Sequence, residues 1–187
     1  MTLEKVYYAR IETSEGSTWA AATEKGLLRT EPEKEALFEE VGRKLEAEFV
    51  EDPSRFEELR EWFDAFYRGE PVRYDGPLDL RGTEFQKKVW EAIHDISHGS
   101  LTSYGRIADD IGRPRAARAV GNAVGANPMG PVIPCHRVVW SNGGIGGFGG
   151  GLERKRMLLA LEGVLPTAEG TPEKGIDLRR FFSRAKK

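Results

Sequence analysis

Residues 69–82, GEPVRYDGPLDLRG, divide the chain into two parts with different patterns. Three glycines and two prolines interrupt this segment, so neither the period of a helix nor the alternation of a strand runs through it. We expect a linker or an extended crossing segment here. The 187 residues are enough for two small domains. The pattern predicts a scaffold domain at residues 1–79, a second domain at residues 80–165 and a C-terminal basic tail at residues 166–187.

The two parts also differ in charge. Residues 1–79 carry 11 Lys and Arg against 20 Asp and Glu, whereas residues 80–187 carry 17 against 10. This contrast favours a second part that meets a polyanion such as nucleic acid, although an uneven solvated surface would give the same counts.

Composition excludes several classes of protein. The only cysteine, Cys135, cannot form an internal disulfide, which is typical of a reducing compartment. No apolar run approaches the roughly 18 residues of a membrane helix. The first residues, MTLEKVYYARIE, lack the apolar core of a signal peptide. We therefore expect a cytoplasmic protein without a membrane partner.

The first part predicts strands followed by helices. Residues 5–13 alternate apolar and polar side chains, and STWAAATEKGLLRT predicts two further strands around a turn at Glu24, Lys25 and Gly26. One helix is predicted to carry a stripe of Leu37, Val41, Leu45 and Phe49. A second is expected to start at Ser54 with the capping box SRFE and to bury Phe56, Leu59, Trp62, Phe63 and Phe66.

The second part predicts three consecutive helices. Thr83 opens a capping box, TEFQ, and Ser103 is placed to cap a short helix that ends at Gly112. Pro114 suits the first turn of the next helix, which should continue to Pro128. The last two helices, with the Gly-containing turn between them, have the outline of a helix-turn-helix, although helical hairpins are common. His94 and His98 lie four residues apart, but no third metal ligand is visible, so we expect them to be solvated or to cap the helix.

The segment PVIPCHRVVW places Cys135 between a proline and a histidine. A lone cysteine is most often a small buried hydrophobe. Pro134 lacks an N–H and favours a rigid turn, which allows the thiol and the imidazole of His136 to share one site. Thiolate is the nucleophilic form of cysteine, so a nearby base predicts a reactive sulfur that is ionised by its histidine neighbour.

A glycine-rich loop and a helix follow this segment. GGIGGFGGG holds seven glycines in nine residues, which indicates either a low-complexity linker or a loop that approaches a pocket closely. The next helix, LERKRMLLALEG, carries Glu162 near its end. Glu162 is either a surface residue or the group that orients the His136 imidazole.

Together these motifs resemble a known family. IPCHRVV, preceded by ARAVG and ANP and followed by the glycine-rich loop and LLALEG, is similar to the active-site half of the O6-alkylguanine-DNA alkyltransferases. These are also called methylated-DNA-protein-cysteine methyltransferases. Residues 80–165 carry the resemblance, and residues 1–79 match only in character. It implies an α+β fold, with an N-terminal ribonuclease H-like strand-and-helix domain and a mostly helical, winged-helix-like C-terminal domain.

The resemblance also implies catalytic roles. Cys135 would take the alkyl group from guanine O6, with His136 acting through a water as the base and Glu162 supporting it. Tyr104 in SYG matches the tyrosine that assists the leaving guanine at N3. Asn127 in ANP matches the hinge asparagine that links the DNA-binding element to the active-site turn.

Further positions match residues that contact substrate or DNA. Arg118 matches the arginine that enters the duplex as the damaged nucleotide flips out, and the family uses this helix in the minor groove. Ser141 matches a serine that contacts DNA. The implied DNA-binding set also includes Arg113, Arg115 and Ala117, and the implied substrate-binding set comprises Val138, Ser141, Phe148 and Gly149.

Three features depart from the family. Phe148 stands where many members have a tyrosine, and Gly149 where some have a serine that bonds the alkylated oxygen, so that contact is not expected here. The zinc site of some members is excluded, because residues 1–79 contain no Cys or His. Residues 166–187 extend past the shared core as a basic tail with a short helix.

We therefore expect a DNA repair enzyme, a methylated-DNA-[protein]-cysteine S-methyltransferase that moves an alkyl group from O6-alkylguanine, or O4-alkylthymine, in double-stranded DNA to Cys135. It should be a monomer without cofactor or metal. A thioether has no carbonyl for water to attack, so one turnover per molecule is expected. The alternatives are a sensor of alkylated DNA, a winged-helix regulator with an inert cysteine, and a thiol hydrolase that uses Cys135 and His136.

Overall fold

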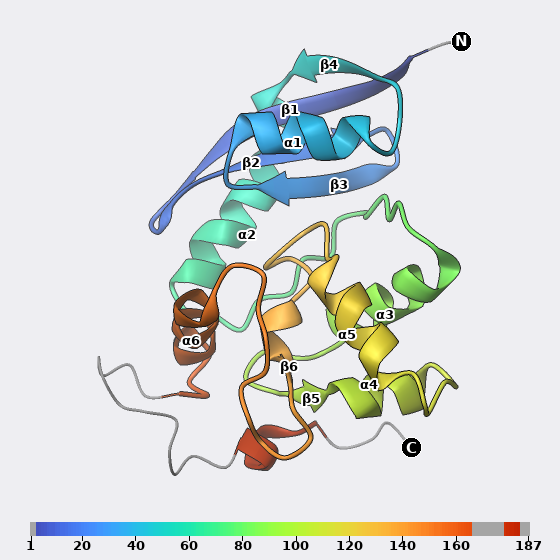
Figure 1. Ribbon diagram of the computed structural model, residues 1–187. Helices are drawn as coiled ribbons and strands as arrows, with labels where there is room; N and C mark the ends of the chain where they lie inside the picture. Colours follow the sequence, from blue (N-terminus) through green and yellow to red (C-terminus); the bar gives the residue numbers. More distant parts are fainter. Residues whose placement is uncertain (1–2, 166–177, 184–187) are drawn as a thin grey trace. The chain divides into compact units, whose positions relative to one another are not determined.

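The computed structural model describes residues 3–165 and 178–183 (Figure 1). The chain separates into two compact units, one ending at Arg81 and one beginning at Gly82. Within the described residues the fold is mixed α/β, with one small four-stranded sheet, a two-stranded pair and six α-helices.

The first unit is built on the four-stranded sheet. Strands β1 (Glu4–Thr13), β2 (Gly16–Thr23) and β3 (Gly26–Glu31) are antiparallel neighbours, which confirms the three predicted strands. Strand β4 (Ala47–Glu51) lies parallel to β1, so the order is β3-β2-β1-β4.

The predicted helix through Phe49 is wrong in its second half. Helix α1 (Lys34–Gly42) ends early, and Phe49 lies in β4 instead. The Phe49 ring stacks on Phe38 of α1 at 4.1 Å between centroids, and Leu45 packs against the same cluster. The four apolar residues share one core although they come from α1, the turn after it and β4, so their spacing imitates one helical stripe.

The next helix begins later than predicted. A 3₁₀ turn at Pro53–Phe56 (η1) precedes helix α2 (Glu57–Tyr67), and the side chain of Asp52 accepts a hydrogen bond from the Ser54 N–H. Asp52, and not the predicted Ser54, therefore caps the 3₁₀ turn that leads into α2. The five predicted core residues of this region are all buried.

The crossing segment, residues 69–82, forms backbone hydrogen bonds with β3 in the first unit. The Leu27 N–H donates to Pro77 at 2.8 Å and the Asp79 N–H donates to Leu27 at 2.7 Å. Gly26 has φ of +138°, and a Cβ there would lie 2.2 Å from the Pro77 carbonyl oxygen. Only glycine fits this close approach of two backbones.

Three helices begin the second unit. They are α3 (Glu84–His94), α4 (Tyr104–Asp110) and α5 (Ala117–Gly125), and α5 packs against both of the others. The Thr83 capping box and the Ser103 cap are confirmed. The predicted start at Pro114 is wrong, because the Ala116 N–H donates to Arg113 in a turn before α5. The helix also stops at Gly125, before Pro128.

Two-residue strands, too short to show alternation, bring distant segments together. Strand β5 (Thr102–Ser103) lies parallel to β6 (Val138–Val139), which follows the 3₁₀ turn Cys135–Arg137 (η2). Helix α6 (Leu152–Leu161) comes after the glycine-rich loop (Figure 1).

The described end of the chain packs beside β5. The Leu101 N–H donates to Phe181 at 2.8 Å, and the Ser183 N–H donates to Leu101 at 2.9 Å. Leu178, in the 3₁₀ turn Leu178–Phe181 (η3), is buried with Val139, Ile145 and their neighbours. The rest of the predicted tail, residues 166–177 and 184–187, lies outside the described residues. None of the described helices has the length and apolar character needed to cross a membrane.

Candidate active site

Cys135 lies on a turn, as Pro134 predicts. The Cys135 N–H donates to Ile133 at 2.8 Å, and the Arg137 N–H donates to Pro134 at 2.9 Å. The side chain of Cys135 is partly exposed, whereas its neighbours on both sides are buried. The turn is therefore buried except at Cys135 itself.

Asn127 fastens this turn to the end of α5. Its side-chain Nδ2 donates to the Ile133 carbonyl oxygen at 2.7 Å, and its Oδ1 accepts from the Met129 N–H at 3.0 Å. The Asn127 amide also forms a hydrogen bond with Cys135 that favours the thiolate. The structure thus brings Asn127 and Cys135 together.

His136 and Glu162 form a buried pair. Nε2 of His136 lies 2.8 Å from Oε1 of Glu162, and the exposed fractions of the two residues are 0% and 6%. Arg137 donates from Nη2 to the same oxygen at 2.8 Å and from Nε to Oε2 at 3.1 Å. The backbone N–H of Gly99 supplies a further donor to Oε2 at 3.1 Å. Four donor groups therefore hold this carboxylate in place.

Tyr104 lies between the glycine-rich loop and α5. A Cβ added at Gly146, whose φ is +77°, would lie 3.0 Å from the Tyr104 hydroxyl oxygen, and one added at Gly121 would lie 3.8 Å from the Tyr104 ring. The loop is therefore a close-approach loop at Gly146. The Trp140 ring also packs against Tyr104, at 5.0 Å between centroids.

The residues predicted to bind substrate are spread over several environments. Val138 is buried in β6, and Phe148 is half-buried. Ser141 and Gly149 are exposed, and Ser141 lies in a turn closed by a hydrogen bond from the Gly143 N–H to Trp140 at 3.0 Å. The structure shows no bond between Cys135 and the side chains of Val138, Ser141 and Phe148, and Gly149 has no side chain to form one.

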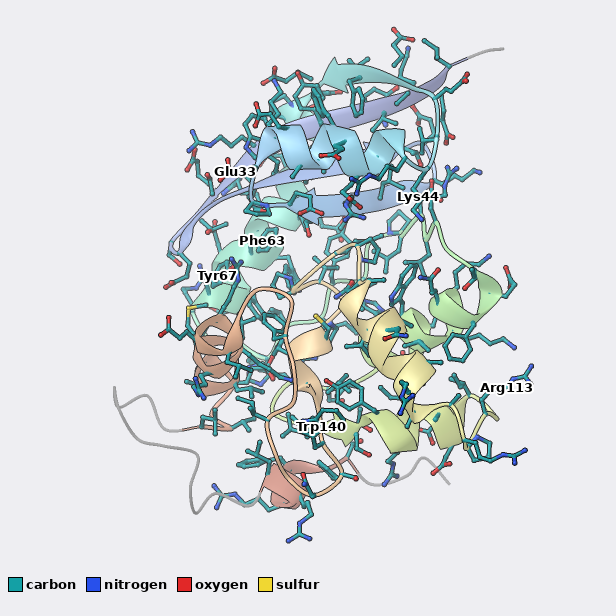
Figure 2. All side chains as sticks on the ribbon, viewed as in Figure 1. Glu33, Lys44, Phe63, Tyr67, Arg113 and Trp140 are labelled. Atoms are coloured by element: carbon teal, nitrogen blue, oxygen red, sulfur yellow. The ribbon has the colours of Figure 1, made fainter. Side chains whose placement is uncertain are left out.

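The residues predicted to bind DNA lie on α5 and the turn before it. Ala117 begins α5 and is half-buried, while Arg113, Arg115 and Arg118 are exposed. Figure 2 shows Arg113 extending away from the helices. None of the three arginines forms an ion pair with another described residue. By contrast, Arg55 and Arg60 in the first unit are paired with carboxylates.

The described part of the chain contains no cluster of side chains that could bind a metal ion. No group of three His, Cys, Asp or Glu side chains there is placed to hold an ion.

The comparison with known proteins places this site in a family. Residues 84–164 match the family described as 6-O-methylguanine DNA methyltransferase, DNA binding domain. A methylated-DNA–protein-cysteine methyltransferase of Methanosarcina acetivorans is 40% identical over 160 residues, which cover 84% of this chain and 99% of that protein. The chain belongs to the methylated-DNA–protein-cysteine methyltransferases. The protein of that name from Mycolicibacterium paratuberculosis is 51% identical over 114 residues, covering 61% of this chain and 69% of that one.

Solved structures agree with this methyltransferase assignment. The crystal structure of Mycobacterium tuberculosis OGT in complex with DNA matches with a TM-score of 0.72 and 39% identity, covering 83% of this chain and 92% of that chain. The small sheet and the helices described above are thus the arrangement of known methyltransferases.

The pKa shifts define the charge states in this methyltransferase. Burial raises the pKa of Cys135, against the Asn127 hydrogen bond, and burial lowers the pKa of His136, against its hydrogen bond with Glu162. At neutral pH the sulfur is therefore a thiol beside a neutral imidazole. This differs from the predicted sulfur already ionised by His136, because desolvation of both groups outweighs their stabilising partners.

Glu162 behaves in the opposite way. Burial by itself would raise its pKa, but the hydrogen bonds and charges of His136 and Arg137 lower the pKa to about 2. Glu162 is therefore an anion throughout the neutral range, and it receives the His136 Nε2–H. The neutral imidazole then has its other nitrogen, Nδ1, as the proton acceptor.

Sequence reasoning missed Lys155. Its side chain is fully buried on α6, and Nζ donates to the carbonyl oxygens of Val138 at 2.7 Å and Gly147 at 3.1 Å. Its charge favours the Cys135 thiolate. The signal was available, because Lys155 shares a helical stripe with Leu158, Leu159 and Glu162. The run ERKR around it resembles a solvated face instead.

Proposed function

We propose that this protein repairs DNA by transferring an alkyl group from O6 of alkylated guanine directly to its own Cys135. The supporting observation is the arrangement around the sulfur. Cys135 is partly exposed on a turn held by Asn127, next to a neutral His136 that is oriented by the Glu162 anion. This is the nucleophile, base and orienter set of covalent catalysis.

The reaction follows from these charge states. His136 takes the thiol proton through a water, and the sulfur attacks the alkyl carbon as its bond to O6 breaks. Burial and the charge of Cys135 raise the pKa of Tyr104, so its hydroxyl stays protonated and can give a proton to N3 of the leaving guanine. The product is a thioether that no group at the site can hydrolyse, so each molecule acts once.

Duplex DNA is the partner that the surface supports. The guanine O6 is stacked inside the helix, so the nucleotide must be flipped out at a cost of a few kcal/mol before the thiol can reach it. The exposed arginines Arg113, Arg115 and Arg118 supply charge for the phosphates. Arg118 is proposed to enter the duplex in place of the flipped nucleotide.

The finer expectations belong to the same proposal. The first unit is proposed to be a ribonuclease H-like scaffold, and the second a winged-helix-like domain that carries both the DNA-binding helices and the alkyl acceptor. The protein is proposed to act as a cytoplasmic monomer. The proposal also places four residues near the substrate because of their positions in the family pattern: Val138, Ser141, Phe148 and Gly149.

Intact mass measurement tests the function directly. After incubation with duplex DNA containing O6-methylguanine, we expect a gain of one methyl group on Cys135 and none in Cys135→Ser. DNA binding without any adduct would favour a sensor or regulator instead. Repeated turnover on esters or peptides would indicate a thiol hydrolase.

A second comparison tests Arg118. We expect Arg118→Ala to slow the reaction with duplex DNA far more than the reaction with free O6-benzylguanine, with Arg10→Ala in the first unit as the control. Equal slowing of both reactions would count against a role in nucleotide flipping.

A further inference from the structure

Trp140 is a large aromatic side chain that stands out of the second unit beside the active site. It is 54% exposed, whereas Trp62 and Trp90 are buried. Figure 2 labels it where the chain leaves β6. Isolated exposed apolar side chains are common on protein surfaces, so exposure alone assigns no role.

The backbone around Trp140 holds the ring in a defined place. The Trp140 N–H donates to Gly144 at 2.8 Å, and the Gly143 N–H donates back to Trp140 at 3.0 Å. The Asn142 side chain accepts from the Gly144 N–H at 3.0 Å. A Cβ at Gly144 would lie 3.2 Å from Cδ1 of the indole, so the turn fits closely against the ring.

Trp140 also contacts the active-site residue Tyr104, which in turn borders helix α5. Its ring lies 5.0 Å from that of Tyr104, with 50° between the planes. Tyr104 in turn borders α5 at Gly121. Arg118 precedes Gly121 by three residues and so lies on the same face of α5. An exposed indole thus packs on the site tyrosine, and an exposed guanidinium lies on the helix that borders this tyrosine.

This combination is suited to nucleic acid. Guanidinium groups without carboxylate partners attract phosphates, and a rigid exposed aromatic ring offers a stacking surface for a base. We propose that Trp140 stacks on a nucleobase of the DNA next to the flipped nucleotide and thereby contributes to DNA affinity. The inference rests on the proposed function, because it takes duplex DNA as the partner.

Fluorescence and binding titrations with duplex DNA test the inference. Tryptophan emission of the wild type should be quenched by DNA, and Trp140→Phe should lose most of the quenching but keep its affinity within about threefold. Trp140→Ala should weaken DNA binding by about tenfold, since base stacking is removed. Because stacking releases no counterions, the salt dependence of its binding should match that of the wild type. Leu152→Ala, at another exposed apolar residue, is the matched control and should bind as the wild type does.

The reaction with free O6-benzylguanine separates DNA contact from indirect effects. Trp140→Ala should react with the free base within about twofold of the wild-type rate, while circular dichroism confirms its folding. If the free base and the duplex were slowed equally, Trp140 would act only by supporting Tyr104. Unchanged DNA affinity together with quenching that persists in Trp140→Phe would also overturn the inference. Failure of the proposed function is a separate result, in which wild-type Cys135 gains no alkyl group.

Discussion

His136 and Arg137 are neighbours in the chain, and both place a nitrogen 2.8 Å from the same carboxylate oxygen, Oε1 of Glu162. The arrangement sets two opposed effects on the imidazole. Glu162 raises the pKa of His136, while the charge of Arg137 lowers it. Burial is the largest effect and also lowers this pKa, so the imidazole remains neutral and available as a base.

Glu162→Gln should lower the rate of methyl transfer by about 100-fold, the usual scale of general base catalysis. The amide keeps the shape of the side chain but removes the charge that raises the proton affinity of His136. It also leaves the Arg137 guanidinium buried without an anion, so the free energy of unfolding should fall by about 3 kcal/mol. Single-turnover kinetics and urea unfolding measure the two effects.

Glu153→Gln, on an exposed position of the same helix, is the control for this variant and should change neither quantity. An unaltered transfer rate in Glu162→Gln would show that Glu162 has no part in orienting the base.

The rate of transfer should rise with pH through an apparent pKa below 6.5, the ordinary value for histidine. The protonated imidazole cannot accept the thiol proton, and burial lowers the pKa of His136. A second rise is expected above pH 9.0, because burial also raises the pKa of the Cys135 thiol. Single-turnover rates between pH 4.5 and 10, measured on protein whose Cys135 is not yet alkylated, check both rises. A single rise centred near pH 7 would contradict these charge states.

Stability should decrease in acid in two stages. The folded-state pKa of His136 lies below its unfolded value of 6.5, so its contribution is present above pH 6.5 and is lost as the pH falls through the folded pKa. The pKa of Glu162 falls from 4.5 to about 2, so its contribution is lost between those values. Urea unfolding at pH 7, 5 and 3 measures the loss. Between pH 5 and 3, Glu162→Gln should lose less stability than the wild type, and the remaining loss comes from other carboxylates of lowered pKa such as Asp79.

Sequence patterns predicted the parts of the fold that rest on local signals. The Thr83 capping box and the Ser103 cap depend on residues three positions apart, and Pro134 fixes its turn through its own backbone. Patterns failed where distant segments decide the outcome. Phe49 lies in a strand and not in the predicted helix, because β4 pairs with the distant strand β1. The pairing of β5 with β6 likewise joins residues far apart in the chain.

The active site shows the same division. The motif around Cys135 identified the nucleophile and the base, but their charge states depend on burial, which no motif encodes. Lys155 was missed although it shares a helical stripe with Leu158 and Leu159, because the charged run ERKR around it is typical of a solvated face. Trp140 was missed because its exposure is visible only once the turn after β6 is built.

Lys155→Met should slow methyl transfer at neutral pH. The change keeps much of the side-chain volume but removes the charge that favours the Cys135 thiolate. The Val138 and Gly147 carbonyl oxygens also lose their donor. The pH dependence of Cys135 alkylation by iodoacetamide should shift to higher pH. At neutral pH, each unit by which the pKa of the Cys135 thiol rises lowers its thiolate fraction about tenfold. Lys88→Met, on an exposed position of α3, should leave this profile unchanged.

Leu178→Ala should destabilise the protein by about 2–4 kcal/mol, because it opens a cavity in a closed apolar cluster. Leu178 is 1% exposed and packs with Leu101, Val139 and Ile145. Leu101 leads into β5 and Tyr104, while Val139 and Ile145 flank the Trp140 turn, so this C-terminal contact supports the loop beside the active site. Leu152→Ala, at an exposed leucine, should cost far less in urea unfolding. Equal stability of Leu178→Ala and wild type would show that the end of the chain adds nothing to this core.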